Sequence, residues 1–423
     1  MTIGLLLACA FLLYRCERIE PVDIPNVEFL EALIQQGVDR DGDGIISRAE
    51  AEDVVQLDVR GYYLQDGEYL ERNITSLEGI EAFINLESLQ CDENSISSLD
   101  LSSNSRLVNL SCNSNGLTTL DISNCPQLEH LECATNQLTN LDVTTNYALR
   151  TLFCHDNQLS NLDISNNPAL DSLDCYDNQL GMLDVSKNGA LIWFISGYNR
   201  LTELDVSNNP ELTVLACYNN LIDELDVSGN LKLEHLDCTE NLISSLDLST
   251  NTELIALHCS RNELNTLDVS QQPSLANLLC SKNHLTSLDL KSNADLEWLS
   301  CYENLLDTIL FPENCQLRTV YCYENQLRSL DVRSFPYIET LDCRKNNLRG
   351  LFPSNPALKF IYCGENQLTE LDIRLNTGLF TLSCRNMPTL EKVCVWTLPL
   401  PDEQVSVDTT GSPNVYFTTN CNQ

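Results

Sequence analysis

Oxygen-bearing side chains occur at regular spacing near the N-terminus, where residues 39–50 read DRDGDGIISRAE. The segment fits the pattern D-x-D-x-D-G-x5-E at every required position. In that pattern, side chains at positions one, three and five, a carbonyl at seven and a bidentate carboxylate at twelve bind Ca2+. The ligands would be Asp39, Asp41, Asp43, the Ile45 carbonyl and Glu50. The sequence therefore predicts structural Ca2+ near the N-terminus.

A short helix is predicted to lead into this loop. Asn26 is a residue type that caps helix N-termini, and Val27, Leu30 and Ile34 would share one apolar face. Gly37 should end the helix before the loop begins. The resulting helix–loop–helix unit would cap the N-terminal end of the segments that follow.

The loop resembles those of EF-hand and dockerin-type calcium-binding proteins. The resemblance covers residues 39–50, and the sequence contains no second loop of this kind, which argues against cooperative calcium sensing. Our hypothesis is that Ca2+ rigidifies the N-terminal cap. Ser47 and Glu50 also form the S-x-x-E capping box of a helix start, which would exist without a metal ion.

Most of the chain repeats the pattern L-x-x-L-x-C-x-x-N-x-L-x-x-L-D-[VIL]-S. From Leu86 it recurs in fifteen coils, mostly of 21 residues, with Ser196 in place of one cysteine and Met387 in place of the last asparagine. The marker cysteines are Cys91, Cys112, Cys133, Cys154, Cys175, Cys217, Cys238, Cys259, Cys280, Cys301, Cys322, Cys343, Cys363 and Cys384. Repetition over this length predicts a stacked array of coils.

Each coil has an inner and an outer side. Alternation along a short strand places Leu110 and Cys112 on one face, and Ser111 and Asn113 on the other. A single coil cannot bury its apolar face, so neighbouring coils must stack and their strands must run parallel. The asparagine three residues after each marker cysteine turns the chain out of the strand, and its amide can satisfy backbone groups that the turn leaves unpaired.

This repeat is similar to that of the leucine-rich repeat family, and the short period with L-D-V-S turns looks like bacterial internalin-type surface proteins. The resemblance covers about residues 54–396. It implies a leucine-rich repeat solenoid, a curved right-handed coil with a parallel β-sheet on the concave face and mostly irregular turns on the convex side. A small α-helical N-terminal cap and a β-rich C-terminal cap would close it. The marker cysteine departs from the family, because internalins usually carry leucine or isoleucine there.

The N-terminal segment is predicted to direct export. Residues 1–16 form an apolar run of signal-peptide size, which is short for a membrane-spanning helix. The tetrapeptide ending at Cys9 resembles a bacterial lipobox, and Cys16 precedes an acidic tether, so Cys9 or Cys16 would carry a lipid anchor. The predicted organisation continues with a tether at 17–26, the helical cap at 27–56, the repeats at 57–390 and the C-terminal cap at 391–423.

The marker cysteines are predicted to be free, buried packing residues. Each coil supplies one cysteine and all point in parallel, whereas zinc sites use converging ligands in paired spacings. Neighbouring Cβ atoms should lie about 4.8 Å apart, beyond the ~3.8 Å that a disulfide prefers. Cys125 and Cys315 fall in convex turns. Cys394 and Cys421 lie among strand-like runs of the C-terminal cap, where a disulfide between them would suit an exported protein.

Aspartate recurs in the second segment of most coils. The residues are Asp100, Asp121, Asp142, Asp163, Asp184, Asp205, Asp226, Asp247, Asp268, Asp289, Asp331 and Asp372. Like charges one strand apart repel unless each accepts backbone hydrogen bonds, so a local turn-capping role is favoured. A line of calcium sites is the alternative.

The concave face is the binding surface that the resemblance implies. It presents the residues one before, one after and three before each marker cysteine, and these include many aromatic residues and four of the five histidines. Aromatic side chains favour recognition, although they can also merely stack along a parallel sheet. The strongest candidates lie where the repeat is least regular. They are Trp298, Tyr302, Tyr321, Tyr323, Arg344, Phe360 and Tyr362.

Charge and motifs narrow the class of function. The chain has 61 acidic and 24 basic residues, a net charge of −37, which disfavours nucleic acid and anionic membrane surfaces. No sequence motif of a hydrolase, metalloprotease or nucleotide-binding enzyme is present. The sequence therefore predicts a non-catalytic, exported cell-surface binding or adhesion protein, either an outer-membrane lipoprotein or secreted. Its ligand would be a protein or a carbohydrate, and it would contact a membrane only through its N-terminal segment. The alternative is a passive structural scaffold; monomer and dimer both stay open.

Overall fold

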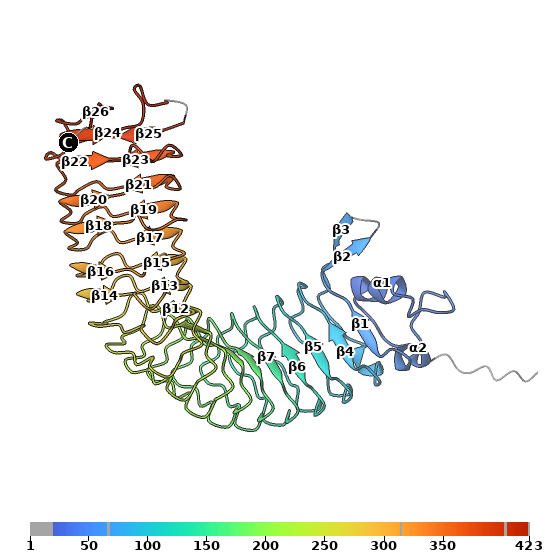
Figure 1. The fold of residues 1–423 in the computed structure, drawn as a ribbon. Helices are drawn as coiled ribbons and strands as arrows, with labels where there is room; N and C mark the ends of the chain where they lie inside the picture. Colours follow the sequence, from blue (N-terminus) through green and yellow to red (C-terminus); the bar gives the residue numbers. More distant parts are fainter. Residues whose placement is uncertain (1–19, 66–67, 314, 402–403, 422–423) are drawn as a thin grey trace, which may run out of the picture. The chain divides into compact units, whose positions relative to one another are not determined.

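The computed structural model describes residues 20–65, 68–313, 315–401 and 404–421. The chain divides into two compact units, Met1–Leu170 and Asp171–Gln423. Both units are built mainly of stacked coils, and successive coils contribute strands to a parallel sheet (Figure 1). The sheet formed at the marker cysteines is called the main sheet below.

Helix α1 (Val27–Gln35) opens the first unit and begins as the sequence predicts. The Asn26 side chain accepts a hydrogen bond of 2.8 Å from Phe29 N, and Gly37, with a φ of +75°, follows the helix end. The left-handed glycine lets Val38 N reach back to Leu33 O at 3.0 Å, which satisfies a carbonyl of the last turn.

The predicted apolar face of this helix is wrong. Phe29, Ala32 and Leu33 are the buried residues. Val27 is 61% exposed and Ile34 is 38% exposed. Both sets of three residues have the spacing of a helix face. The face with Phe29 is the buried one, because the Phe29 ring packs against that of Phe83 with ring centroids 6.5 Å apart.

The main sheet of the first unit begins before the first marker cysteine. Its strands are β1 (Gln56–Asp58), β4 (Ser88–Gln90), β5 (Asn109–Ser111), β6 (His130–Glu132) and β7 (Thr151–Phe153). They pair in parallel and in register. Helix α2 (Arg48–Glu52) precedes β1, and a 3-10 turn, η1 (Ile80–Ala82), lies between β3 and β4.

An antiparallel hairpin of β2 (Tyr62–Gln65) and β3 (Glu68–Glu71) is inserted after β1. The sequence analysis missed it. Asp66-Gly67 lies between two runs of strand-forming residues, which is the typical hairpin signal and could have indicated it.

The main sheet of the second unit continues the same pairing, coil by coil. Its strands are β8 (Ser172–Asp174), β9 (Trp193–Ile195), β10 (Val214–Ala216), β11 (His235–Asp237), β12 (Ala256–His258), β13 (Asn277–Leu279), β15 (Trp298–Ser300), β17 (Thr319–Tyr321), β19 (Thr340–Asp342), β21 (Phe360–Tyr362), β23 (Thr381–Ser383) and β25 (Ser406–Asp408). Because β25 pairs with β23, the predicted C-terminal cap extends the main sheet by one strand.

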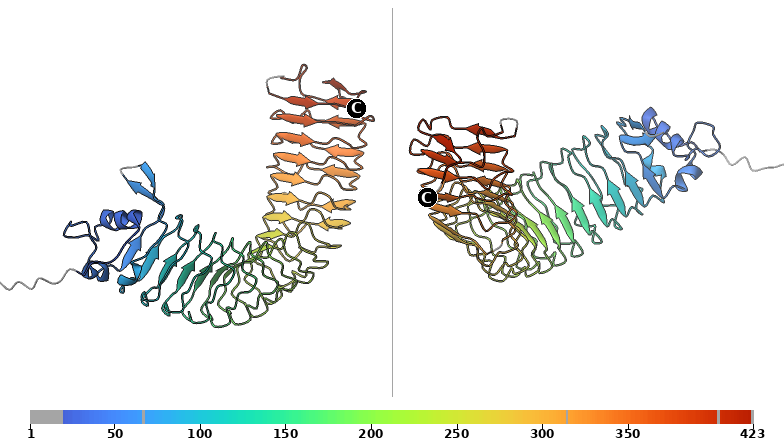
Figure 2. Two further views of the ribbon diagram at one scale, coloured as in Figure 1. Left: turned by 180° about the vertical axis from the view of Figure 1, so that it is seen from behind. Right: turned by 45° about the horizontal axis from the view of Figure 1, so that its top comes forward.

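A second row of strands appears in the later coils of this unit. It comprises β14 (Ser287–Asp289), β16 (Thr308–Leu310), β18 (Ser329–Asp331), β20 (Gly350–Phe352), β22 (Glu370–Asp372), β24 (Lys392–Cys394) and β26 (Tyr416–Thr418). These strands form separate short parallel sheets on the side away from the main sheet (Figure 2). The second segments of these coils approach closely enough to pair, as Leu290 N does with Leu310 O at 2.7 Å. The earlier second segments are irregular, as predicted.

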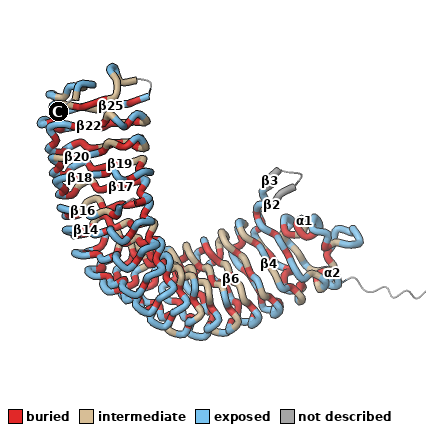
Figure 3. Tube along the Cα trace, viewed as in Figure 1, coloured by how far each residue is buried: buried red, intermediate tan, exposed pale blue. Residues whose placement is uncertain are grey.

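Leucine and cysteine fill the interior of the coils, which appears as a buried band along the chain in Figure 3. Leu110 is 1% exposed and Cys112 is fully buried, whereas Ser111 and Asn113 on the other face are only partly covered. All fourteen marker cysteines are buried, and none of them forms a disulfide. Ser196 occupies the same column, and its buried Oγ has no hydrogen-bond partner among the described residues.

The marker asparagines form the predicted hydrogen-bonded ladder. Asn115 Nδ2 donates to Cys91 O of the preceding coil at 3.0 Å and to Cys112 O of its own coil at 3.2 Å. Its Oδ1 accepts from Ile96 N at 3.0 Å. One side-chain amide thus bonds the backbone of two coils. The residue before each position of this ladder adopts a left-handed conformation, as Ser114 does with a φ of +52°. None of these fifteen residues is a glycine.

A second amide ladder, which the sequence analysis missed, lies in the turn after the aspartate. Asn230 Nδ2 donates to Val206 O at 3.0 Å and to Asn209 O at 2.9 Å, and the same arrangement recurs in neighbouring coils. Cys125 takes this position in its coil and is fully buried, with its Sγ 3.7 Å from Asn104 O. The sequence signal is an asparagine four residues after the aspartate.

The aspartates of the second segments cap turns, as the sequence analysis favoured. Asp205 Oδ1 accepts the backbone N–H of Ser207 at 2.9 Å, and the equivalent bond recurs along the array. Hydrogen bonds from Ser207 lower the pKa of Asp205. Along the described chain these aspartates form no group of three convergent metal ligands.

No helix in the described part of the chain is long and apolar enough to cross a bilayer. The predicted signal or anchor region at residues 1–16, including Cys9 and Cys16, lies outside the described residues.

Candidate functional site

The solvent face of the main sheet brings four of the predicted ligand-binding residues into one column. Tyr302 and Tyr323 stack with ring centroids 4.4 Å apart and planes 6° apart. The Arg344 guanidinium lies 5.6 Å from the centre of the Tyr323 ring and 5.5 Å from that of Tyr362. We call Tyr302, Tyr323, Arg344 and Tyr362 the aromatic column. Tyr302, Tyr323 and Arg344 each follow a marker cysteine, so parallel pairing places them side by side in successive coils. Tyr362 instead precedes its marker cysteine and is in register with Asp342.

Arg344 is held in this position by a carboxylate that the sequence analysis did not single out. Its Nε and Nη2 donate to the two oxygens of Asp342 at 2.9 and 2.6 Å. The Asp342 side chain is only 5% exposed, whereas that of Arg344 is 47% exposed. The hydrogen bonds to Asp342 raise the pKa of Arg344. A buried acceptor therefore fixes a solvent-accessible cation between two rings, and the D-x-R spacing within one coil was the available sequence signal.

Lys282 extends the column at its other end. Its Nζ lies 6.0 Å from the centre of the Tyr302 ring and 3.1 Å from Glu303 Oε1. Desolvation raises the pKa of Tyr323 to about 12.

The other predicted residues lie on the same sheet but make separate contacts. Trp298, which is 41% exposed, meets Tyr321 edge-on with ring centroids 5.8 Å apart. The Phe360 ring packs against that of Phe380, with ring centroids 6.1 Å apart. Phe380 is not among the predicted residues. The structure thus resolves the predicted cluster into a column, a Trp–Tyr pair and a Phe–Phe pair.

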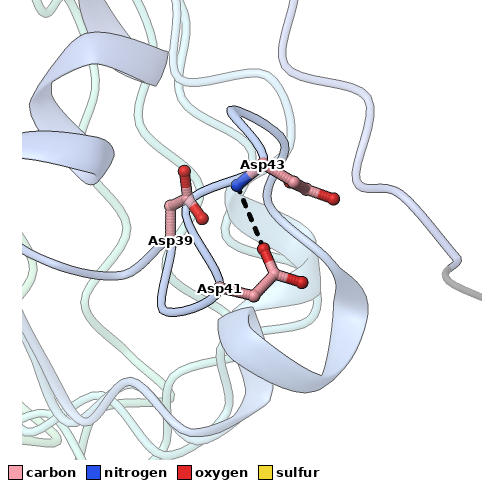
Figure 4. Close-up of side chains that lie close together, drawn as sticks. All are labelled: Asp39, Asp41 and Asp43. Carbon is pink, nitrogen blue, oxygen red and sulfur yellow. Dashed lines mark hydrogen bonds between the residues drawn. The ribbon is translucent and has the colours of Figure 1, made fainter.

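The N-terminal loop brings its three aspartates together. Ligand oxygens of Asp39, Asp41 and Asp43 lie within 4.8 Å of one another (Figure 4). Asp39 accepts from Gly42 N at 2.7 Å and Gly44 N at 3.0 Å, and Asp41 accepts from Asp43 N at 3.1 Å. These bonds wrap the backbone around the carboxylates, and hard oxygen donors are the ligand type that suits Ca2+.

Glu50, the predicted twelfth-position ligand, lies beside the loop but outside that group of three. Its Oε1 accepts from Arg40 N at 2.7 Å, and its Oε2 accepts from Ser47 N at 2.9 Å within a capping box. Desolvation raises the pKa of Glu50, but the hydrogen bonds from Ser47 and Arg40 outweigh it and lower the pKa. Ile45, whose carbonyl is the remaining predicted ligand, is 45% exposed.

The disulfide found among the described residues lies near the C-terminal end. Cys394 and Cys421, the predicted pair, form a disulfide that ties the end of the chain to β24. Burial raises the pKa of Cys217 and that of Cys280 to about 12. A buried, protonated thiol is a poor nucleophile at neutral pH, and these side chains pack in the interior of the coils.

No protein-family model and no curated protein sequence matches the chain. Among solved structures, the functional domain of InlJ from Listeria monocytogenes, described as including a cysteine ladder, is 31% identical, with a TM-score of 0.70; the match covers 89% of this chain and 78% of that one. The internalin InlF from Listeria monocytogenes is 19% identical, with a TM-score of 0.58, covering 78% and 92%. The plant peptide hormone receptor RGFR1, solved in complex with RGF2, is 19% identical, with a TM-score of 0.58, covering 80% and 69%.

The coil stack and these likenesses define a leucine-rich repeat protein. Within that class, the chain belongs to the internalin-type family that includes InlJ. The cysteine expected to depart from the family is shared with InlJ, whose domain has a cysteine ladder of its own.

Proposed function

We propose that this chain is a non-catalytic, exported binding protein that captures a protein ligand on the solvent face of its main sheet at residues 298–362. The observation that carries the proposal is the aromatic column with Arg344 fixed by buried Asp342. A preorganised cation and flat rings lose little conformational entropy on binding, which is why arginine and tyrosine dominate binding hot spots. RGFR1, which shares the fold, binds the ligand named in its structure, and this supports a protein or peptide as the kind of partner.

Local charge supports the same place. Residues 316–395 carry ten basic and eight acidic residues, whereas the chain as a whole carries 24 and 61. Most of the acidic excess therefore lies elsewhere. A protein surface of ordinary charge can approach the aromatic column without the repulsion that the rest of the array would impose on an acidic partner.

We further propose that Ca2+ binds the loop at Asp39, Asp41 and Asp43 and rigidifies the N-terminal cap. The convergent carboxylates support this, and the left-handed glycines Gly42 and Gly44 shape the loop. Glu50 would complete the ligand set by turning from its capping bonds toward the ion. The ion would be structural and would take no part in ligand capture.

The ligand proposal is tested by surface plasmon resonance with the immobilised chain and a panel of purified extracellular proteins and glycans. We expect a protein that binds saturably and loses at least tenfold in affinity to the Tyr302→Ala, Tyr321→Ala, Tyr323→Ala variant, because hot-spot rings each contribute about 1–2 kcal/mol or more. Arg344→Lys should weaken binding as well, since lysine cannot hold both oxygens of Asp342.

The matched control removes exposed rings that lie off the main sheet of the same unit, Tyr337→Ala with Phe352→Ala. It should bind normally. If a protein ligand binds the tyrosine variant with unchanged affinity, the binding site lies elsewhere. If the saturable ligand is a glycan, the proposed ligand class is wrong. If no ligand binds saturably, a passive scaffold is favoured.

A further inference from the structure

Three tyrosines meet on the main sheet of the second unit, in the coils that contain β8, β9 and β10. Tyr176 and Tyr198 lie with ring centroids 5.3 Å apart, Tyr198 and Tyr218 lie 5.7 Å apart, and Tyr176 and Tyr218 lie 5.9 Å apart. Tyr198 is 47% exposed, and the other two are partly covered. We call these residues the tyrosine cluster. It shares no residue with the aromatic column.

The sequence of one coil changes to make room for the cluster. Where other coils continue with the marker cysteine, this one reads Ser196-Gly197-Tyr198. A Cβ on Gly197 would lie 2.8–3.0 Å from three atoms of the Tyr218 ring. The glycine therefore permits that ring to lie against the backbone between its two neighbours, which a side chain would prevent.

Two carboxylates flank the cluster on the same face. In-register pairing aligns Asp174 with Ile195, then Ala216, then Asp237, so the two aspartates stand on either side of an apolar pair. The pKa of Tyr218 is raised to about 12. Burial is the largest cause, followed by Tyr176 and then by the charges of Asp237 and Asp174. The two carboxylates disfavour an anion beside the Tyr218 ring.

Cations are few within the coils of the cluster, although the next coil places His258 Nδ1 3.4 Å from Asp237 Oδ2 and pairs Arg261 with Glu240. Residues 171–240 include thirteen acidic and three basic residues. The basic ones are Lys187, Arg200 and Lys232, and none of them belongs to β8–β11 or to the two residues after a marker position. Lys232 pairs instead with Glu211. Aromatic faces beside carboxylates attract cations through the ring quadrupole and the charge together.

We propose that the tyrosine cluster is a second binding surface, and that it takes an arginine or lysine side chain of a basic protein segment. The cation would rest on the faces of Tyr198 and Tyr218, with Asp174 and Asp237 on either side. This goes beyond the proposed function, because it assigns a different place and a different ligand chemistry from the aromatic column.

The test is fluorescence anisotropy at 0.15 M salt with a labelled Gly-Arg-Gly-Arg-Gly peptide and its citrulline analogue, which keeps the shape and lacks the charge. We expect the arginine peptide to bind and the citrulline peptide to bind at least tenfold more weakly. Tyr198→Ala with Tyr218→Ala should weaken the arginine peptide about tenfold, whereas Tyr218→Phe, which keeps the ring, should bind as the unchanged protein does.

Glycine variants separate the arrangement of the rings from their presence. Gly197→Ala keeps all three tyrosines and the net charge but displaces Tyr218, so it should weaken the arginine peptide several-fold. Gly181→Ala is the matched control, because a Cβ there meets nothing within 4 Å. Equal binding of both peptides, or full affinity in the double alanine variant, would overturn the proposal; neither result would bear on the aromatic column.

Discussion

Ser196 lies in the column of buried marker cysteines. Its hydroxyl forms no hydrogen bond with any described residue. A buried hydroxyl without a partner costs about 1–3 kcal/mol, whereas a thiol behaves as a small apolar group. Its neighbours in the column, Cys175 and Cys217, show which side chain the position accepts. The exception falls in the coil that carries Gly197 and Tyr198, so the change at Ser196 accompanies the local remodelling around the tyrosine cluster.

Ser196→Cys should therefore stabilise the protein. We expect the free energy of unfolding to rise by about 1 kcal/mol, measured by urea denaturation followed by circular dichroism. The reverse change, Cys217→Ser, is the matched control and should lower it. A stability loss in Ser196→Cys would show that the hydroxyl has a favourable role in the folded protein.

Among the elements, the capped turns are sensitive to acid. The pKa values of Asp184, Asp205 and Asp226 are lowered, mainly by hydrogen bonds from the serine two residues on. Because the folded-state pKa lies below that of the unfolded chain, each carboxylate stabilises the fold at pH values above about 4. That contribution is lost as the pH falls through the lowered values.

We expect the thermal midpoint to fall between pH 4 and pH 2. In Asp205→Asn, which keeps an oxygen acceptor for Ser207 and does not titrate, the fall should be smaller than in the unchanged protein. Thermal melts at several pH values measure both. An identical acid profile would mean that this turn contributes nothing to the pH dependence.

The N-terminal loop is an element whose stability should depend on calcium. At free Ca2+ about 100 times the Kd, binding stabilises the folded state by about 2.7 kcal/mol. EDTA should lower the melting temperature of the unchanged protein and leave that of the Asp41→Ala, Glu50→Ala variant unaltered. Asp23→Ala with Glu31→Ala, which removes the same charge from the tether and the cap outside the loop, should keep its sensitivity to EDTA. If EDTA lowers the melting temperature equally in all three proteins, Ca2+ does not bind at this loop.

The sequence predicts the elements that repeat and misses those that occur once. The coil stack, the marker asparagine ladder and the capping aspartates follow from a pattern that each coil restates. The buried face of α1 depends on where Phe83 lies, and the place of Arg344 depends on buried Asp342. Contacts of this kind occur once in the chain, so the repeat pattern does not predict them. The paired second segments of the later coils also escape prediction, although Leu310 and Phe352 replace the usual aspartate in two of them and could have indicated a difference.

Across the whole molecule, charge is distributed unevenly along the chain. Residues 316–395 are close to electrically balanced, while residues 171–240 are strongly acidic. Salt screens attraction between exposed charges over about 10 Å at 0.1 M. The two proposed surfaces should therefore respond differently to ionic strength, although both are lined with aromatic rings.

Raising salt from 0.05 to 0.5 M should weaken the arginine peptide at the tyrosine cluster about tenfold or more. The affinity of a protein captured on the aromatic column should change less than about threefold over the same range. Anisotropy and surface plasmon resonance titrations at both salt concentrations measure this difference. Equal salt sensitivity would mean that charge plays the same part at both surfaces.

The left-handed residues beside the asparagine ladder have a consequence for how such an array changes its specificity. Glycine would adopt this conformation with the least strain, yet the fifteen positions carry residues as different as Glu93, Tyr198, Arg261 and Lys345. The neighbouring amide bonds hold the backbone there whatever side chain it bears. Recognition can therefore be rewritten one coil at a time along this edge, by exchanging a single residue in each turn while the scaffold beneath keeps its shape.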